Sequence, residues 1–410
     1  MKEGKRYGLI GEKLGHSFSP AIHAKLGTPQ YGLFELRPEE LGAFLEGDNF
    51  DGANVTIPYK KAVMSYCAEL TDQAKRIGSV NTLVRRADGT LLGHNTDYDG
   101  FLYMLRSAGA EVAGKKCLIL GTGGASLTVH TVLQDLGARE IVYISRTGEN
   151  NYQNLDRHAD ARIIVNATPV GMYPKTGVAP VDLAMFPGCE GVFDLIYNPA
   201  RTQLLLDAER RGIPCANGLG MLVAQAKAAS ERFRDITIPD QVVREITEQM
   251  ERETKNILLV GMPGCGKSTI GRLLAKKLKR PLVDTDEVIV EKIGCTIPEY
   301  FASHGEEAFR AREHEALRET ACRSGLVIAT GGGIVTRREN WDPLRENSVV
   351  VFLRRDISKL PTKGRPISQS NDLNQLYEAR RPLYEAVADL VVNNEKIDRT
   401  VEEILKKLGL

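Results

Sequence analysis

The sequence carries almost no surplus of charge: its 410 residues include 54 Lys and Arg against 53 Asp and Glu, a formal net charge of +1. Binding to DNA, RNA or an anionic membrane usually requires a basic surface, so this balance argues against those partners. No apolar run approaches the roughly 18 residues of a membrane span. The N-terminal residues lead directly into a strand-like segment without the apolar region of a signal peptide.

Cysteine is also sparse. The seven cysteines are an odd number without paired spacing, which predicts free thiols in a reducing compartment, the cytoplasm. Neither an internal repeat nor a low-complexity tract is present. A chain of this length is too long for one core, so we expect two to four globular domains.

One motif indicates its chemistry once the residues on both sides of it are considered. The stretch 261–268 fits Gly-x-x-x-x-Gly-Lys-Ser, between an apolar run of strand length and apolar residues at helical spacing. Such a loop leaves backbone N–H groups free to surround a phosphate, and the helix dipole adds to their attraction. The motif predicts a nucleoside triphosphate site, with Lys267 at the outer phosphates and the Ser268 hydroxyl on Mg²⁺. The predicted ATP-binding residues are Gly261, Gly264, Cys265, Gly266, Lys267, Ser268 and Thr269.

A second glycine turn predicts a dinucleotide site. Residues 116–121 resemble a strand, 121–126 a turn that opens a helix, and 140–145 a second strand, which together form a βαβ unit. The second strand ends in Arg146 rather than in an acid that would bind the ribose of NAD, and arginine suits the added phosphate of NADP. We therefore predict a preference for NADP. The predicted cofactor residues of this unit are Gly121, Gly123, Gly124, Ala125, Ser145, Arg146 and Thr147.

Short polar motifs in the first 98 residues each allow two interpretations. Ser17 and Ser19 either cap a helix or face a small anionic substrate. Lys60 follows a strand end, where a lysine is usually a solvated surface residue. Asn81 and Asp97 lie in short polar segments that could be simple turns.

Taken together, these motifs resemble the shikimate dehydrogenase family. Ser-x-Ser-Pro, Asn-Val-Thr-x-Pro-x-Lys, Val-Asn-Thr and Asn-Thr-Asp occur in the family's order and local spacing. The resemblance implies that Lys60 and Asp97 are the catalytic pair and that the serines hold the substrate carboxylate. The substrate residues that it implies are Ser17, Ser19, Thr56, Asn81, Tyr197 and Gln225, with Asp97 also at a ring hydroxyl.

Later segments extend this resemblance. The motifs that begin at residues 165, 194 and 217 also match, and they imply that Asn166, Thr168 and Met221 lie along the cofactor. Residues 217 to about 232 would form a helix that returns to the first domain. Leu127 and Asn150 replace basic residues of many family members, which predicts a weaker NADP preference.

The last 155 residues add functional side chains around the phosphate loop. Asp284 and Asp286 stand two apart at the end of an apolar run, so we expect them on one face of a strand. Arg310 lies in a helical segment, where an arginine near glutamates is more often structural. Residues 329–333 place three glycines after a strand, which allows a ligand to approach the backbone. We expect residues 380–384 to open the last helix.

These elements resemble shikimate kinase across essentially the whole region. The resemblance implies that Asp286, Arg310, Gly332 and Arg380 bind shikimate, the two arginines holding its carboxylate. It also implies that Ser268 and Asp284 hold Mg²⁺, that Asp286 and Lys267 are catalytic, and that Arg365 stabilises the transferring phosphoryl group.

The expected fold is α/β: a substrate domain with a Rossmann-type NADP domain, followed by a P-loop kinase domain with a parallel sheet. We expect the substrate domain at 1–98, the NADP domain at 99–216, returning helices and a linker at 217–255, and the kinase at 256–410. The predicted reactions reduce 3-dehydroshikimate with NADPH and phosphorylate shikimate with ATP and Mg²⁺. The alternatives are an NAD-dependent quinate dehydrogenase, a kinase of another small polyol, and a half that only binds a metabolite.

Overall fold

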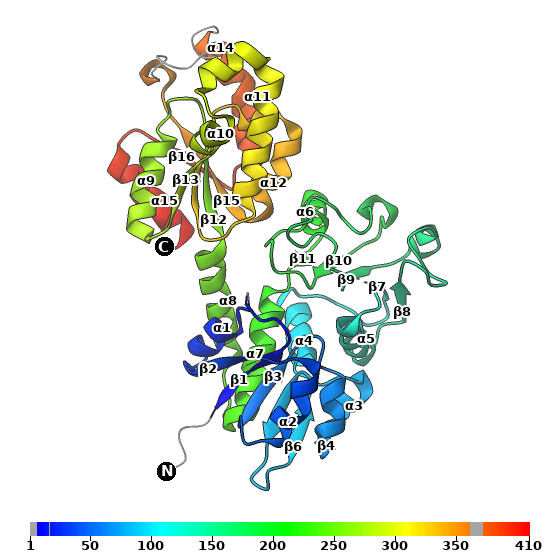
Figure 1. Cartoon of the computed structure of the whole chain (residues 1–410). Helices are drawn as coiled ribbons and strands as arrows, with labels where there is room; N and C mark the ends of the chain where they lie inside the picture. Colours follow the sequence, from blue (N-terminus) through cyan, green and yellow to red (C-terminus); the bar gives the residue numbers. More distant parts are fainter. Residues whose placement is uncertain (1–5, 16, 361–371) are drawn as a thin grey trace. The chain divides into compact units, whose positions relative to one another are not determined.

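The computed structural model describes residues 6–15, 17–360 and 372–410 (Figure 1). The chain divides into two compact units. The first consists of Met1–Val170, Ala179–Tyr197 and Asp207–Gln249, and the second of Gly171–Val178, Asn198–Leu206 and Met250–Leu410. Both are built from helices and largely parallel sheets, so the predicted α/β class is confirmed.

The first unit begins with a mixed sheet. Its strands are β1 (Tyr7–Gly11), β2 (Tyr31–Glu35), β3 (Gly52–Val55), β4 (Glu69–Leu70), β5 (Thr82–Arg85) and β6 (Leu91–His94). They lie in the order β2-β1-β3-β5-β6-β4, parallel around β1 and antiparallel around β5. The helices between them are α1 (Ser19–Lys25), α2 (Leu41–Glu46) and α3 (Asp72–Ile77), and α4 (Asp97–Ser107) follows. The carboxyl ends of β3 and of β6, which α4 follows, are therefore distant in sequence but belong to one sheet.

The second sheet of this unit is fully parallel. Its strands are β7 (Lys116–Leu120), β8 (Glu140–Ile144), β9 (Ile163–Asn166), β10 (Gly191–Asp194) and β11 (Cys215–Ala216), and α5 (Gly124–Asp135) joins β7 to β8. The order is β11-β10-β9-β7-β8, so the chain reverses its direction of winding at β7. In open α/β sheets, ligands bind outside the carboxyl ends of the strands at such a point, which here is the turn after β7.

Helix α7 (Leu219–Arg234) covers the segment that was expected to form a returning helix. It packs against α1 and α4 and against β3 and β5 of the first sheet. The Tyr7 hydroxyl donates a hydrogen bond to the Phe233 carbonyl oxygen at 3.0 Å, and the two rings stack. Helices α6 (Gln203–Arg210) and α8 (Asp240–Thr254) cross the division between the two units.

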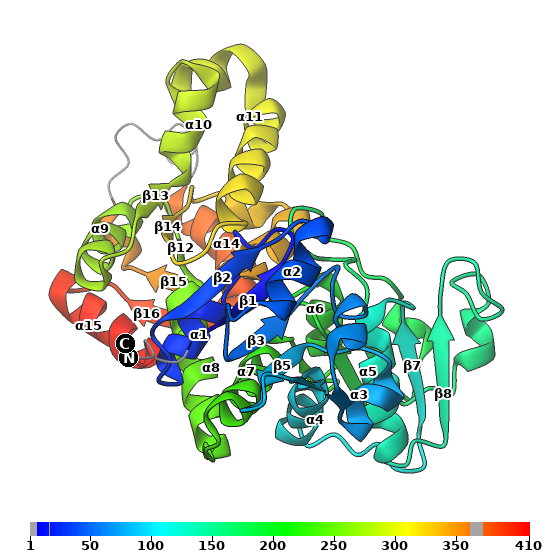
Figure 2. The same ribbon diagram turned by 60° about the horizontal axis from the view of Figure 1, so that its bottom comes forward.

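The second unit contains the third sheet, also parallel. Its strands are β12 (Asn256–Val260), β13 (Leu282–Asp284), β14 (Val327–Ala329), β15 (Ser348–Arg354) and β16 (Leu390–Asn393), in the order β13-β14-β12-β15-β16. The helices are α9 (Lys267–Leu278), α10 (Thr285–Ile293), α11 (Ile297–Ala321), α12 (Trp341–Glu346), α14 (Leu373–Val387) and α15 (Ile397–Leu408). β12 is central and wholly buried, and Figure 2 shows α10 and α11 side by side, extending away from the sheet.

The expectation that residues 380–384 open the last helix is wrong. Arg380 lies inside α14, and α15 follows it. The start of α14 is set upstream by Asp372, whose carboxylate accepts a hydrogen bond from the Asn374 N–H at 2.8 Å. Pro382 is accommodated within the helix rather than at its start.

All seven cysteines are free thiols, as their spacing predicted. None of the helices in the described ranges combines the length and apolar composition needed to cross a membrane.

Candidate active sites

The first unit holds a cavity of about 460 Å³. Every side chain predicted to bind or convert the dehydrogenase substrate lines it: Ser17, Ser19, Thr56, Lys60, Asn81, Asp97, Tyr197 and Gln225. They come from the β1–α1 loop, the end of β3, the segment before β5, the start of α4, the end of β10 and helix α7. Residues about 200 positions apart in sequence thus surround one small space.

Lys60 and Asp97 form the most direct contact in this cavity. The Lys60 Nζ lies 2.6 Å from Asp97 Oδ2, and both side chains are mostly buried. Asp97 is the first residue of α4, where the helix N-terminus favours its negative charge. A lysine donor and a carboxylate held this closely can share one substrate oxygen and exchange a proton with it.

The Asn81 amide is oriented by a buried network. Its Oδ1 accepts hydrogen bonds from the Thr96 N–H at 2.7 Å and from the Thr82 and Thr96 hydroxyls. The carbonyl side of the amide is therefore occupied, which leaves Nδ2 as the group available to a ligand. We infer that Asn81 donates a hydrogen bond to a substrate oxygen.

A second asparagine, Asn54, extends the hydrogen-bond network around Asn81. The Tyr31 hydroxyl donates to Asn54 Oδ1 at 2.7 Å, while Asn54 Nδ2 donates to the Thr82 hydroxyl. The His23 ring stacks on Tyr31, and burial lowers the pKa of His23 to about 3, so His23 is neutral. Asn54 itself lines the cavity but was not among the predicted site residues, although it opens the Asn-Val-Thr motif.

The β1–α1 loop presents the two serines. The Ser17 Oγ accepts the N–H of Ser19 at 3.2 Å, so it supports the start of α1 as well as facing the cavity. The N-cap of α1 is Phe18, and no side chain caps this helix, so Ser17 is not its cap; the contact of Ser17 with an anionic substrate stays a prediction. Tyr197 approaches this loop through its ring, whose centroid lies 5.5 Å from that of Phe18.

The predicted glycines of the NADP site lie at the turn after β7. Gly121 has a φ of +102°, and a Cβ there would lie 2.7 Å from the Thr168 side chain, so glycine is required at this position. At Gly123 and Gly124 a Cβ would meet no atom within 4 Å, which leaves open space in front of the start of α5. The residues present therefore fit a pyrophosphate at the helix N-terminus.

Asn166 lies at the end of β9 and forms hydrogen bonds within the protein. Its Oδ1 accepts hydrogen bonds from the N–H and the hydroxyl of Thr168, and its Nδ2 donates to Asp194 Oδ1 at 3.0 Å. The buried amide thus shapes the turn that carries Thr168. Its contact with the cofactor stays a prediction, as does that of the half-buried Met221.

Arg146 follows β8 and is exposed, with no ion pair or hydrogen bond recorded in the described part of the chain. Ser145 accepts the Gly148 N–H at 2.8 Å and so tightens the loop on which Arg146 and Thr147 lie. A guanidinium without an ion pair can bind a phosphate through two parallel hydrogen bonds.

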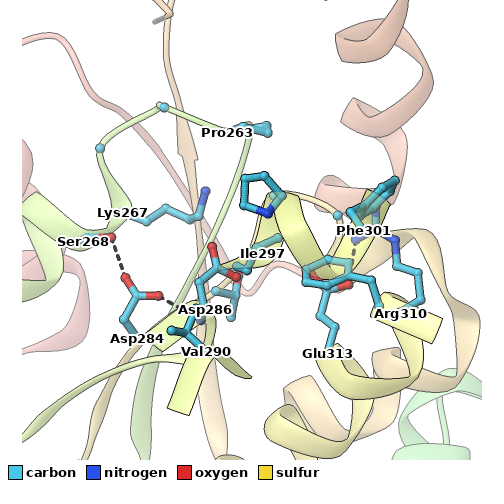
Figure 3. A pocket seen from close by; sticks show the side chains of 18 of the residues that line it. Pro263, Lys267, Ser268, Asp284, Asp286, Val290, Ile297, Phe301, Arg310 and Glu313 are labelled. Atoms are coloured by element: carbon cyan, nitrogen blue, oxygen red, sulfur yellow. Dashed lines mark hydrogen bonds and ion pairs between the residues drawn. The ribbon is translucent and has the colours of Figure 1, made fainter. Parts of the chain in front are cut away.

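The second unit holds a larger cavity, of about 660 Å³, around the phosphate loop. Figure 3 shows Lys267, Ser268 and Asp284 at one end, Arg310 with Glu313 at the other, and Asp286 between them. The Lys267 Nζ donates to the carbonyl oxygens of Gly261 and Met262 at 2.9 and 3.1 Å. These bonds hold the lysine over the loop that would surround a phosphate.

The two aspartates reach the cavity differently from the prediction. Asp284 ends β13 and caps α10, its Oδ1 accepting the Asp286 N–H at 3.1 Å, so Asp286 lies in the first helical turn. The expectation that both lie on one strand is therefore wrong. The Ser268 hydroxyl donates to Asp284 Oδ2 at 2.6 Å, and this pair of hard oxygen donors fits Mg²⁺ beside the phosphate loop.

Asp286 has an unusual acidity. Burial, together with the negative charges of Asp284 and Glu313, raises its pKa from 3.8 to about 6. Its Oδ1 is buried without a hydrogen-bond partner within the ranges that the structure describes. A carboxylate in this state is a stronger proton acceptor than an ordinary aspartate.

Arg310 is both structural and exposed to the cavity. It forms ion pairs with Glu313 at 2.7 Å and with Glu306 at 3.0 Å. A Cβ on Gly333 would lie 2.0 Å from its guanidinium, and one on Gly331 would lie 2.6 Å from Glu313 Oε1. The Arg310 and Glu313 side chains therefore lie directly against the glycine triplet.

Arg380 completes the far end of the cavity. It donates to the Gly332 carbonyl oxygen at 3.2 Å, and the Tyr384 hydroxyl donates to the same oxygen. Arg365 lies outside the described residues. Glu313 and Arg355 also line the cavity but were not predicted. Glu313 lies three residues after Arg310 on the same helix, and Arg355 directly follows β15, so their positions in the sequence could have indicated them.

Comparison with known families gives a separate match for each of the two parts of the chain that hold these cavities. Residues 9–83 match the family model described as shikimate dehydrogenase substrate binding domain, and residues 263–409 match the model described as shikimate kinase. A shikimate dehydrogenase (NADP(+)) of Clostridium beijerinckii is 36% identical over 268 residues, which cover 61% of this chain and 99% of that protein.

Solved structures are similar over the same region. A chorismate mutase/shikimate 5-dehydrogenase fusion protein from Clostridium acetobutylicum is 39% identical with a TM-score of 0.58, covering 61% of this chain and 98% of that one. A shikimate 5-dehydrogenase of Thermus thermophilus, in complex with NADP(H) and shikimate, is 30% identical with a TM-score of 0.55, covering 60% and 99%. The chain therefore belongs to the shikimate dehydrogenase family and joins to it a shikimate kinase domain, as a bifunctional enzyme.

Proposed function

We propose that the cavity of the first unit reduces 3-dehydroshikimate to shikimate and that the cavity of the second unit transfers the γ-phosphoryl group of ATP to a hydroxyl of shikimate. The observation that carries the first half is the 2.6 Å contact of Lys60 with Asp97 inside a cavity that all the predicted substrate residues line. For the second half it is the position of Asp286 between the phosphate loop and Arg310.

In the dehydrogenase, Ser17 and Ser19 bind the substrate carboxylate while Thr56 and Asn81 bind ring oxygens. Bound NADPH supplies the hydride to the ketone carbon. Lys60 donates a proton to the oxygen that develops negative charge, and Asp97 accepts a hydrogen bond at the same site. Lys60 regains its proton from solvent, since its side chain is partly exposed.

The adenosine end of the cofactor lies beside Arg146 in this proposal. The guanidinium binds the added phosphate of NADP, and the open space at Gly123 and Gly124 receives the pyrophosphate. Leu127 and Asn150 add no charge to this contact, so the preference for NADP depends mainly on Arg146.

In the kinase, Arg310 and Arg380 bind the shikimate carboxylate at the end of the cavity away from the phosphate loop. Asp286 accepts the proton of the shikimate hydroxyl that attacks the γ-phosphoryl group, ADP leaves, and Lys267 exchanges its two backbone carbonyl contacts for phosphate oxygens. Ser268 and Asp284 would hold Mg²⁺, which offsets phosphate charge. The proposed role of Arg365 in stabilising the transferring group rests on the family motif alone.

Two separate assays on the full chain test these assignments. Absorbance of NADPH should fall on addition of 3-dehydroshikimate, and the rate with NADH should be lower. Shikimate with ATP and Mg²⁺ should give a product heavier by one phosphoryl group. Turnover of quinate with NAD in place of these substrates, or of another polyol by the kinase, would favour the alternative assignments, and binding without turnover would contradict both activities.

A further inference from the structure

The charges around the dehydrogenase cavity do not balance. Among the residues that the structure describes, the charged ones that line it are Lys13, Lys60 and Asp97. Lys60 and Asp97 neutralise each other at 2.6 Å, whereas Lys13 has no hydrogen bond or ion pair recorded in the described part of the chain. Two positive charges against one negative leave a net charge of +1 at the cavity, and Lys13 is its source.

Lys13 is held at the rim by the loop that carries the serines. Next to it, the Leu14 N–H donates to Glu35 Oε1 at 2.8 Å, and the Leu14 side chain is buried. The Ser17 N–H in turn donates to the Leu14 carbonyl oxygen at 3.0 Å. The backbone beside Lys13 is therefore fixed at both of its polar groups, and the lysine shares a short, closed loop with Ser17.

The serines alone are an incomplete site for an anion. Their hydroxyls donate hydrogen bonds but carry no charge, and a carboxylate that leaves water without a counter-charge loses much of its solvation energy. Hydrogen bonds to a charged donor are about twice as strong as neutral ones. We propose that Lys13 supplies this counter-charge and so selects anionic over neutral substrates, an inference that rests on the function proposed above for the same cavity.

The test compares a charged and a neutral substrate without ATP, so that the kinase is silent. Shikimate and its methyl ester are oxidised with NADP⁺ by the wild-type chain, Lys13→Met, Lys13→Arg and the control Lys61→Met, which removes an exposed lysine outside the cavity lining. We expect the KM for shikimate to rise about tenfold in Lys13→Met with little change in kcat. Lys13→Arg should restore most of the affinity, and Lys61→Met should behave as wild type.

The ester separates a charge contact from a structural effect. Because it carries no carboxylate, its KM should be the same in the wild type and in Lys13→Met. Added salt should raise the KM for shikimate more in the wild type than in the variant, since screening acts on the charge that Lys13 provides.

Each other outcome overturns the inference. An equal loss on shikimate and on the ester would make Lys13 a structural residue, and an unchanged KM for shikimate would show that it does not contact the carboxylate. In both cases wild-type turnover of shikimate would leave the proposed dehydrogenase function standing. If the wild type, with its kinase activity intact, oxidised no shikimate, the proposed dehydrogenase function would fail and the role of Lys13 with it.

Discussion

Replacing Asp286 with asparagine should inactivate the kinase and yet stabilise its fold. The pKa of Asp286 is raised from 3.8 to about 6, chiefly by burial and then by the charges of Asp284 and Glu313. Its ionised form is thus disfavoured in the folded state, and a displacement of this size corresponds to about 3 kcal/mol of folding free energy at neutral pH. The substitution Asp286→Asn would remove this charge but keep a buried polar group, so we expect a net gain of about 1 to 2 kcal/mol.

The gain should depend on pH in a defined direction. A carboxyl group whose folded pKa lies above its unfolded value destabilises the protein least below pH 3.8, and the penalty grows until the pH passes about 6. At pH 5 the electrostatic penalty should be about half of its value at pH 7.5. The stability advantage of Asp286→Asn should shrink accordingly.

Trp341 makes the measurement specific to the second unit. It is the one tryptophan in the sequence, and its Nε1 donates to the Val335 carbonyl oxygen at 2.9 Å, so its fluorescence reports unfolding around α12. Urea unfolding of the wild type, Asp286→Asn and the exposed control Glu287→Gln at the two pH values gives the comparison. An Asp286→Asn chain that is no more stable at pH 7.5, or whose advantage is the same at pH 5, would refute the argument.

Three further changes test other parts of the account. The kinase kcat/KM for shikimate should fall as the pH drops below about 6, because Asp286 must be ionised to accept a proton. Glu313→Gln should move this fall to lower pH, since the charge of Glu313 helps to raise the pKa of Asp286. A fall at the same pH in the variant would contradict this cause. Arg146→Ala should lower kcat/KM for NADPH about tenfold and leave that for NADH nearly unchanged. An equal loss of kcat/KM with both cofactors would show that Arg146 does not bind the added phosphate of NADP. Tyr31→Phe removes the 2.7 Å hydrogen bond to Asn54 and should lower dehydrogenase kcat/KM a few-fold while the kinase rate stays constant; an unaffected dehydrogenase would show that the network does not orient Asn81.

Much of both sites could be predicted because their motifs are local. The phosphate loop at 261–268 lies between β12 and α9 as its pattern required, since the strand, the glycines and the helix are adjacent in sequence. The serine pair, Lys60 and Asp97 also follow strand ends or open helices, where spacing along the chain is informative. The family resemblance then supplied the roles that spacing alone left open.

The failures came where a local pattern permitted two structures. The alternation of Asp284 and Asp286 suits a strand, but the Asp284 side chain caps α10 and ends the strand first. Residues 380–384 were expected to open the last helix, but the cap at Asp372 begins α14 earlier. In both cases a hydrogen bond from a backbone N–H to an aspartate carboxylate sets the boundary.

Other features depend on contacts between distant residues. The hydrogen bond from Tyr31 to Asn54 joins β2 to β3 and cannot be inferred from either segment separately. Lys13 and Arg355 are ordinary basic residues in sequence, and their importance comes from cavities that several elements enclose. Only the folded chain shows which charges face those cavities.

The most direct test of the central claim is a single reaction with the full chain, 3-dehydroshikimate, NADPH, ATP and Mg²⁺, analysed by mass. The wild type should convert the ketone to phosphorylated shikimate, with NADPH and ATP consumed in equal amounts. Lys60→Ala should stop reduction but still phosphorylate added shikimate, and Lys267→Ala should accumulate shikimate. The claim is that two independent sites act in turn on one carbon skeleton. It would be contradicted if either substitution alone abolished both activities, or if the wild type formed no phosphorylated product.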